Sequence, residues 1–123
     1  MAERRSDLTD LAHAWLRYQT ERSEEDEWAV DHVMDEYSNF EEAWRIIEAL
    51  CREAATDWEY CNIGAGPIED LLHFNEADSL CRLRRLVNEN PRSIKAVACI
   101  WTSKPSIRQL LDALLEKYKQ PRL

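Results

Sequence analysis

The chain has 123 residues and a net charge of −8, and 45% of its residues are hydrophobic. This length suits one domain with its own core, so we expect a single domain over residues 1–123, and the composition excludes a disordered protein. No stretch reaches the roughly 20 apolar residues of a membrane span, and no apolar run follows the first arginines as it does in a secretory signal. We therefore expect a cytoplasmic location and no contact with membranes.

Only two glycines occur, too few for the tight turns of a strand-rich fold. Apolar residues three or four apart predict helices around the stripes at residues 8–18, 28–37, 40–54, 58–63, 68–74, 80–87, 94–101 and 107–118. Ser6 or Asp7 is expected to cap the first helix, and residues 20–26 are expected to form a loop. The sequence thus predicts an all-α fold, a compact array of seven or eight short helices arranged as a bundle or as small solenoid-like pairs.

Residues 64–67, Gly-Ala-Gly-Pro, are expected to end one helix and begin the next. Pro67 suits a first helical position, because the N–H that it lacks would have no partner there. Gly66 is expected where the chain turns sharply. Glu69 and Asp70 then lie at the positive end of the helix dipole, where one of them can also reach an Arg or Lys of a partner or of a neighbouring helix.

Four cysteines, Cys51, Cys61, Cys81 and Cys99, lie 10, 20 and 18 residues apart. In the absence of an export signal we expect all four to be reduced thiols. Cys51, Cys81 and Cys99 lie in or beside apolar helix faces, so we expect them to be buried. The spacing lacks the close Cys or His pairs of a zinc site, and no metal is expected there.

Three segments carry a resemblance to a known family: Trp-Ala-Val at residues 28–30, Ala-Gly-Pro-Ile-Glu-Asp-Leu-Leu at residues 65–72, and Pro-Arg at residues 91–92 with Ala96, Val97 and Trp101. Over residues 26–101 the chain resembles an uncharacterised bacterial family of small helical domains, a domain of unknown function. The sequence departs from the family at residues 39–40, where Asn-Phe replaces Asp-Pro. The resemblance implies a small helical bacterial protein and brings no activity, cofactor or catalytic residue.

No catalytic centre is recognisable in the sequence, which lacks the Gly-x-Ser-x-Gly turn of a serine nucleophile. Asp10-x-x-His13 and Asp70-x-x-His73 each place a carboxylate and an imidazole on one helix face, a partial likeness to di-iron bundles. This spacing leaves a metal-dependent enzyme as the less favoured alternative. We expect no enzymatic activity, no catalytic residue, no cofactor and no bound metal.

The charges are unevenly distributed along the chain. Residues 1–70 carry 19 acidic and 6 basic residues, a net charge of −13, whereas residues 71–123 carry 5 acidic and 10 basic residues, a net charge of +5. This distribution disfavours direct binding of nucleic acid and favours a basic protein partner. All five tryptophans fall at helical core spacing, so most are expected in the core. Trp28 is the candidate for an exposed anchor, because it follows dense negative charge.

Glu27, Asp31 and Asp35 are one helical turn apart and share a face. Like charges at this spacing destabilise an isolated helix, which indicates a recognition surface. The predicted partner-binding residues are the acidic stretch with its tryptophan and the two carboxylates after Pro67: Glu24, Glu25, Asp26, Glu27, Trp28, Asp31, Asp35, Glu69 and Asp70.

These features predict a non-enzymatic acidic binding protein that masks a basic partner. An immunity protein, or another inhibitor of a nucleic-acid-handling toxin or enzyme, fits this description. The alternative is a structural module that forms homo-oligomers, in which the acidic half of one copy meets the basic half of another. The oligomeric state is expected to be a monomer or a homodimer.

Overall fold

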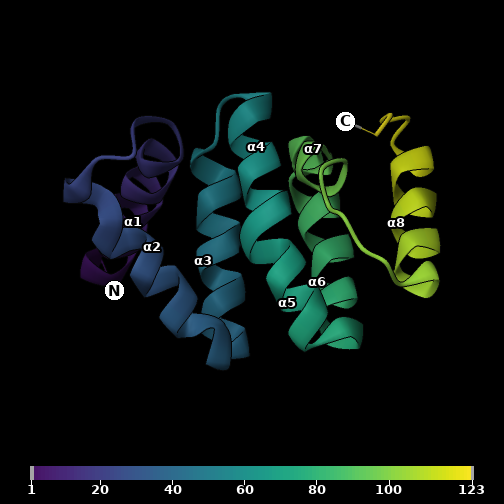
Figure 1. Ribbon diagram of the computed structural model, residues 1–123, viewed down its shortest axis with the longest axis horizontal. Coiled ribbons are helices and arrows are strands. Elements are labelled where there is room, and N and C mark those ends of the chain that lie inside the picture. The colour runs from purple at the N-terminus through teal and green to yellow at the C-terminus, as the bar shows by residue number, and fades with distance from the viewer. Residues whose placement is uncertain (1, 123) are drawn as a thin grey trace. The chain divides into compact units, whose positions relative to one another are not determined.

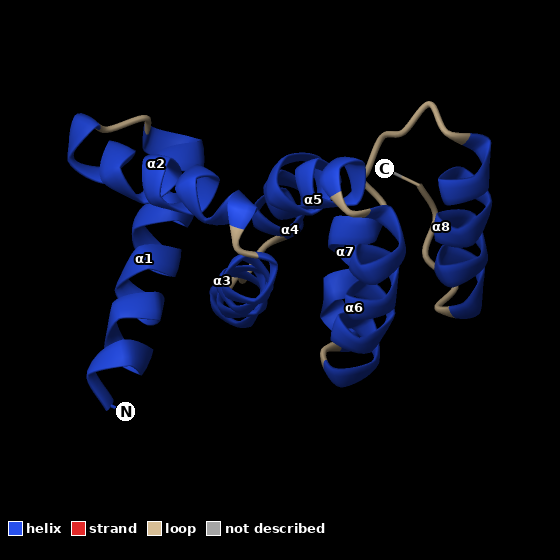
Figure 2. Cartoon of the chain, turned by 90° about the horizontal axis from the view of Figure 1, so that it is seen from below, coloured by secondary structure: helices blue, strands red, loops and turns tan. Residues whose placement is uncertain are grey.

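The computed structural model describes residues 2–122, with side chains from residue 8 onward. Every regular element of this part of the chain is a helix (Figure 2), so the all-α prediction is confirmed. No helix among these residues is long and apolar enough to cross a membrane. The chain divides into two compact units, Met1–Ala55 and Thr56–Leu123, here called unit 1 and unit 2. The expectation of one domain over the whole chain stays a prediction.

Unit 1 is built on two long helices, α1 and α3, which contact each other (Figure 1). α3 is strongly amphipathic and buries Trp44, Ile47 and Leu50 on one face. The Asn39 side chain caps α3 by accepting the Glu42 N–H at 3.3 Å. The elements of unit 1 are α1 (Ala2–Glu21), η1 (Glu24–Asp26), α2 (Glu27–Asp35), η2 (Glu36–Ser38) and α3 (Phe40–Glu53).

The first helix and the following connection differ from prediction. α1 begins at Ala2, so the expected caps Ser6 and Asp7 lie inside the helix. The expected loop over residues 20–26 is mostly helical, because α1 continues to Glu21 and a short 3-10 turn follows. Only the residues between them change the direction of the chain, and Arg22 does so with a left-handed φ of 55°.

Unit 2 is a run of shorter helices. A capping box at Thr56 starts α4, in which the Thr56 hydroxyl accepts the Glu59 N–H at 3.2 Å and the Glu59 carboxylate accepts the Thr56 N–H at 3.1 Å. Figure 1 shows α4 leading into α5, with α6 and α7 beside them. The elements are α4 (Asp57–Ile63), η3 (Gly64–Ile68), α5 (Glu69–Phe74), α6 (Glu76–Glu89), η4 (Pro91–Ser93), α7 (Ile94–Val97) and α8 (Pro105–Lys117).

The expected break at residues 64–67 is wrong. The chain passes through them as a π-helical turn, and both Gly64 and Ile68 have helical backbone angles. In a regular α-helix, proline lacks the N–H for the backbone hydrogen bond, and its ring collides with the carbonyl four residues earlier. The wider backbone of a π-turn leaves room for the Pro67 ring. Gly66 does not make a sharp turn, since neither glycine has a positive φ.

Gly64, which the sequence analysis did not single out, is the glycine that the fold requires. A Cβ at this position would overlap the backbone carbonyl of Ala96 in α7, whereas no described atom crowds a Cβ at Gly66. The absence of a side chain therefore lets the backbones of the α4–η3 helix and α7 approach closely. Ala96 is itself fully buried in this contact.

The same close approach brings two cysteines together. Cys61 and Cys99 form a disulfide with a Cα–Cα distance of 5.2 Å, although they are 38 residues apart in the sequence. The prediction of four reduced thiols is therefore wrong for this pair, because sequence spacing does not reveal a contact made by helix packing. Burial is confirmed for Cys51, whereas Cys99 is only half-buried and the free Cys81 is exposed.

Candidate functional site

The tryptophans divide into a buried and an exposed class. Trp15 and Trp44 are buried as expected, but Trp28, Trp58 and Trp101 are 49%, 58% and 70% exposed. The prediction that most of them lie in the core is therefore wrong. Helical spacing alone did not show which side of each helix meets the rest of the protein. Exposed aromatic side chains are candidates for binding anchors.

In unit 1, Trp28 lies on the outer face of α2 with the predicted carboxylates. Ala29 and Val33, one turn apart, are buried and fix which side of α2 is inward. The opposite side carries Trp28 and Met34, and Met34 is 58% exposed. Glu27, Asp31 and Asp35 are exposed on the same outer side. We call Glu27, Trp28, Asp31, Met34 and Asp35 the α2 face.

The stretch before α2 contains one residue with a different role from the one predicted. Glu24 and Glu25 are exposed, but Asp26 is buried. Both Asp26 carboxylate oxygens accept hydrogen bonds from the Arg17 guanidinium, at 2.7 and 3.1 Å. Asp26 is thus a structural residue that ties the start of α2 to α1. Its assignment as a partner-binding residue is corrected for this reason.

The Arg17 pair also sets the ionisation of Asp26. The hydrogen bonds from Arg17, helped by its positive charge, lower the pKa of the Asp26 carboxyl, and they outweigh burial, which acts in the opposite direction. The folded unit 1 therefore stabilises Asp26 as the negatively charged carboxylate. This arrangement places the first turn of α2, and Trp28 with it.

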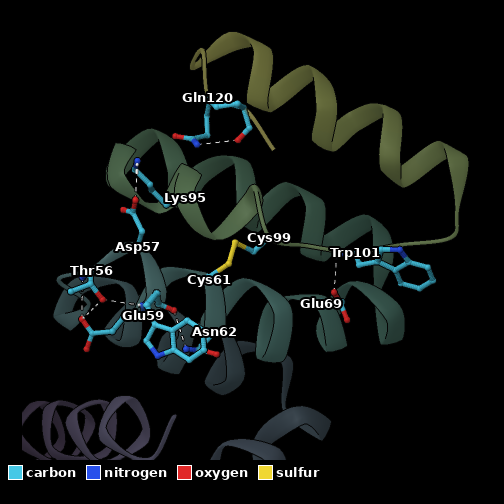
Figure 3. The surroundings of a disulfide bond; sticks show 12 residues. Thr56, Asp57, Glu59, Cys61, Asn62, Glu69, Lys95, Cys99, Trp101 and Gln120 are labelled. Carbon is cyan, nitrogen blue, oxygen red and sulfur yellow. Dashed lines mark hydrogen bonds and ion pairs between the residues drawn. A yellow bond between two sulfur atoms is a disulfide. The ribbon is translucent and has the colours of Figure 1, made fainter. Parts of the chain in front are cut away.

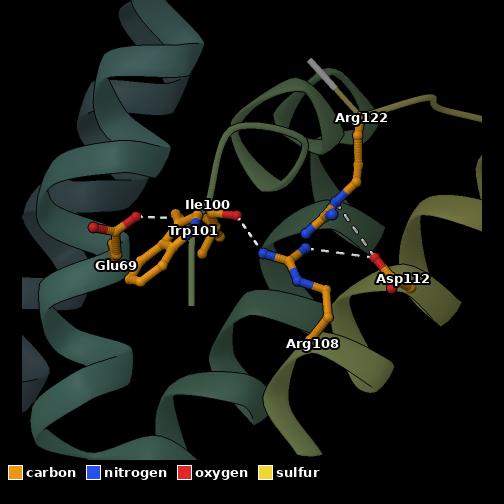
Figure 4. Close-up of polar contacts among 6 residues, drawn as sticks. All are labelled: Glu69, Ile100, Trp101, Arg108, Asp112 and Arg122. Carbon is orange, nitrogen blue, oxygen red and sulfur yellow. Dashed lines mark hydrogen bonds and ion pairs between the residues drawn. The ribbon is translucent and has the colours of Figure 1, made fainter. Parts of the chain in front are cut away.

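In unit 2, Glu69 has a role that the sequence did not indicate. Its carboxylate accepts the backbone N–H of Trp101 at 2.8 Å (Figure 4). We had expected Glu69 or Asp70 to reach an Arg or Lys, but Glu69 instead binds a backbone amide 32 residues away in the sequence. The amide belongs to the extended segment between α7 and α8, residues 100–104, which we call the strap.

The strap is fixed by contacts at consecutive residues. The carbonyl of Ile100 accepts a hydrogen bond from Arg108 of α8 at 2.7 Å (Figure 4). The residue before the strap, Cys99, is joined to α4 by the disulfide (Figure 3). At the other end, the Lys104 ammonium lies 3.3 Å from Glu76 of α6. A short segment without regular structure is thus held by covalent, backbone and charged contacts.

A cavity of about 250 Å³ lies between the strap, α5 and the start of α8. Its wall combines two carboxylates, one imidazole, one indole and one ammonium with apolar side chains. The residues that line it are Glu69, Asp70, Leu72, His73, Trp101, Thr102, Ser103, Lys104 and Ile107. The cavity therefore unites the second pair of predicted site residues with an exposed tryptophan.

A wider groove of about 430 Å³ lies between α6 and α8. Its cations are Arg84, Arg85 and Lys117, and Leu110 and Leu114 contribute apolar surface. Arg85 is 3.6 Å from Glu89 of the same helix, an exposed pair that constrains it weakly. The sequence analysis did not assign this groove, because residues 84–85 and 117 are brought together only by the packing of two helices.

The two Asp-x-x-His pairs lie in different units, the first in unit 1 and the second in unit 2. His13 is hydrogen-bonded to Glu53 of α3 at 2.7 Å, so the partner of its imidazole comes from another helix. His73 lines the cavity in unit 2. Among residues 8–122, whose side chains the structure describes, no group of three or more His, Cys, Asp or Glu side chains could hold a metal ion.

The sequence of the chain matches one family over residues 17–118. The chain belongs to DUF6869, a family of unknown function. The match confirms the resemblance to an uncharacterised domain family and is wider than the expected residues 26–101, since it includes α8. No curated protein and no solved structure matches the chain.

The matched region contains both candidate sites. The α2 face lies in unit 1 and the cavity in unit 2, so the structure separates the nine predicted residues into two groups. The first group contains seven residues, of which Asp26 is structural: Glu24, Glu25, Asp26, Glu27, Trp28, Asp31 and Asp35. The second contains Glu69 and Asp70. For this member of the family we therefore treat the α2 face and the cavity as independent sites.

Proposed function

We propose that this member of the family is a non-enzymatic binding protein whose α2 face masks a basic protein partner. The observation that supports the proposal best is the position of Trp28, half-exposed on the helix face that also carries Glu27, Asp31 and Asp35. An aromatic ring supplies contact area and attracts cations through its face, and the carboxylates attract the same cations over a longer range.

Two further features favour a protein partner over a small molecule. The α2 face is convex, since it is the outer side of a helix, whereas small-molecule sites are concave. Met34 adds a second exposed apolar side chain at the other edge of the row of carboxylates, and methionine adapts its shape to different surfaces. A helix face with apolar anchors and a charged rim is a common protein-recognition surface.

The partner class follows from charge. A protein that handles nucleic acid has a basic site for phosphates, and an acidic face can occupy that site. We therefore propose an immunity protein, or another inhibitor of such a toxin or enzyme, in a bacterial cytoplasm. In that compartment thiol reductants would act on the Cys61–Cys99 bond, so its oxidation state in cells bears directly on the proposed location.

The test measures binding to a purified partner, identified from the gene beside this one or captured from the native host. In one variant, Glu27→Gln, Asp31→Asn and Asp35→Asn are combined. We expect association to slow about tenfold and to depend less on salt, because charges at the rim of an interface act mainly on the encounter rate. Trp28→Ala should instead raise the dissociation rate about tenfold or more.

The matched control removes the same charge elsewhere. Asp10→Asn, Asp78→Asn and Glu116→Gln are exposed positions outside the α2 face, so this variant should associate almost as fast as the unaltered protein. If the partner binds the α2 variant with unchanged rates and unchanged salt dependence, the proposal is wrong.

A second candidate function is supported by the groove between α6 and α8. Its three cations and apolar floor complement the carboxylates and apolar side chains of the α2 face in both charge and character. Self-association of this kind would join the α2 face of one copy to the groove of another, an interface between unlike surfaces.

A charge exchange tests self-association without any partner. One variant carries Glu27→Lys, Asp31→Lys and Asp35→Lys, and the other carries Arg84→Glu, Arg85→Glu and Lys117→Glu. Each variant alone should be monomeric by sedimentation, because its α2 face and its groove then carry charges of the same sign. Their mixture should associate again, because the two altered surfaces are complementary and so are the two unaltered ones. If the unaltered protein stays monomeric at high concentration, the homo-oligomer candidate fails, and the proposed masking function is untouched.

A further inference from the structure

The strap presents Trp101 in a fixed position although most of its side chain is exposed. Its backbone N–H is held by Glu69 at 2.8 Å, and the preceding carbonyl is held by Arg108 at 2.7 Å. Figure 4 shows both contacts on the peptide group that joins Ile100 to Trp101. Both groups belong to the single peptide unit that joins Ile100 to Trp101, so the backbone at the indole is held before any ligand arrives, which lowers the entropy cost of binding.

The size of the adjoining cavity limits what it can hold. Its volume of about 250 Å³ is below the roughly 300–1,000 Å³ of pockets that take a whole drug-sized ligand. It is of the right order for one long side chain. Leu72 and Ile107 give part of the wall an apolar character, which suits the aliphatic stem of such a side chain.

The charged side chains in the wall determine whether the cavity attracts a cation or an anion. Glu69 and Asp70 line the cavity with carboxylates, which repel an anion and attract a cation. Lys104 also lines it, but its ammonium lies 3.3 Å from the carboxylate of Glu76, which offsets the positive charge. The Trp101 indole adds an aromatic surface that favours an ammonium or a guanidinium.

We propose that this cavity binds a single cationic side chain, arginine or lysine, of an incoming polypeptide. Trp101 contacts the stem or the charged group, and the carboxylates of Glu69 and Asp70 receive the charge. The proposal deepens the proposed function, because it gives a basic partner a second point of attachment. It rests on different residues, all in unit 2, so the two can fail separately.

The disulfide makes this site sensitive to oxidation state. Cys99 directly precedes the strap, and its bond to Cys61 fixes that end of the segment to α4 (Figure 3). Reduction by two electrons and two protons converts the bond into two thiols and removes the covalent restraint. The cavity wall formed by Trp101 then depends on the hydrogen bonds at Ile100 and Trp101 and on the contact of Lys104 with Glu76.

The experiment titrates the whole protein with Nα-acetyl-arginine amide and, as a neutral control, Nα-acetyl-glutamine amide. Binding is followed by the NMR signal of the Trp101 indole N–H, assigned with Trp101→Phe. We expect the arginine compound to shift this signal saturably, and the glutamine compound to bind at least about tenfold more weakly. Equal binding of the two compounds, or no shift with arginine, overturns the proposal.

The key variant is Glu69→Gln combined with Asp70→Asn. A glutamine oxygen can still accept the Trp101 N–H, so the strap keeps its contact while the charge is lost. Arginine affinity should fall about tenfold. Trp101→Ala should weaken it similarly, with Trp58→Ala, which removes another exposed tryptophan of unit 2, as the matched control without effect. Unchanged arginine affinity in the Glu69/Asp70 variant overturns the proposal even if the strap is intact.

Two further arms separate the possible outcomes. Reduction of the disulfide should weaken arginine binding several-fold while the signals of unit 1 stay in place, whereas unchanged affinity removes the disulfide from the proposal. The variant with a neutralised α2 face should bind the arginine compound as the unaltered protein does. Loss of arginine binding in that variant would place the cationic site on the α2 face and contradict the cavity.

Discussion

Trp28 and Trp101 are both exposed tryptophans, but the protein holds them in different ways. Trp28 lies on a regular helix, and its direction follows from the helical period once Ala29 and Val33 are buried. Trp101 lies on a strap without regular structure, and its position depends on contacts from three other helices. The comparison teaches that exposure of an aromatic residue can be a consequence of periodicity or a product of tertiary restraint.

The difference has a consequence for how each site responds to change. A helix face is maintained by local hydrogen bonds, so substitutions of its outer residues leave it in place. A strap loses its conformation when one distant contact is removed. Perturbations far from the α2 face should therefore spare Trp28, and perturbations of α4, α5 or α8 should move Trp101.

The largest expected effect separates exposed from buried tryptophan within unit 1. Trp44→Ala removes a fully buried side chain of α3 and should lower the free energy of unfolding by about 3–5 kcal/mol. Trp28→Ala should lower it by about 1 kcal/mol or less, since its side chain is half-exposed. Urea denaturation measures both values, and similar losses for the two variants would show that Trp28 also belongs to the core.

The next effect tests the restraint on the strap. Reduction of Cys61–Cys99 should lower the stability of unit 2 by about 2–4 kcal/mol, because the bond closes a long loop in the unfolded chain. Denaturation with and without reductant measures this loss. The Cys81→Ser variant, which changes an exposed free thiol, should lose the same stability on reduction as the unaltered protein. Thiol titration of the unfolded protein gives the control: two free thiols before reduction and four after it.

The third effect concerns the backbone contact beneath the disulfide. Gly64→Ala places a methyl group against the carbonyl of Ala96 and should destabilise unit 2 by about 1–3 kcal/mol. Gly66→Ala should change stability by less than about 1 kcal/mol, in the stabilising direction, because alanine is the better helix former. If both substitutions have the same effect, the close approach of α7 to the α4–η3 helix is not what holds unit 2 together.

The smallest effect depends on pH and is confined to unit 1. The folded-state pKa of Asp26 lies below its ordinary value, so the pair with Arg17 stabilises the fold fully above the unfolded pKa of about 3.9. This stabilisation is lost as the pH falls through the lower, folded-state pKa. Thermal melts between pH 6 and acid values should show the loss, and Asp26→Asn should reduce it. Equal acid sensitivity of the two proteins would contradict a structural role of Asp26.

Much of the α2 face could be predicted from the sequence. Its carboxylates are spaced by one helical turn, and helical spacing is a local property that survives without knowledge of the packing. The sequence left open whether Trp28 is buried, because an apolar residue at helical spacing fits a core and a surface equally. Asp26 was misassigned because its partner Arg17 belongs to another helix, which no local pattern reveals.

The strap and its cavity could not be predicted. Glu69 was expected to cap a helix or to meet a cation, but the structure gives it the N–H of Trp101. Segments 65–72 and 99–104 are adjacent only because Gly64 lets α7 approach the α4–η3 helix closely. Sequence spacing carries no information on such contacts between distant segments.

By itself the sequence determined the helical class, the uneven charge and the residues that share a face, because all three follow from composition and from the helical period. The tertiary structure alone decided which tryptophans are exposed, which cysteines form the disulfide and which carboxylates hydrogen-bond within the protein. These outcomes depend on how helices pack against one another, and packing is set by shape over the whole unit. In this protein, the contact of Gly64 with the backbone of Ala96 brings the strap to α5, and the cavity in unit 2 depends on this contact more than on any sequence motif.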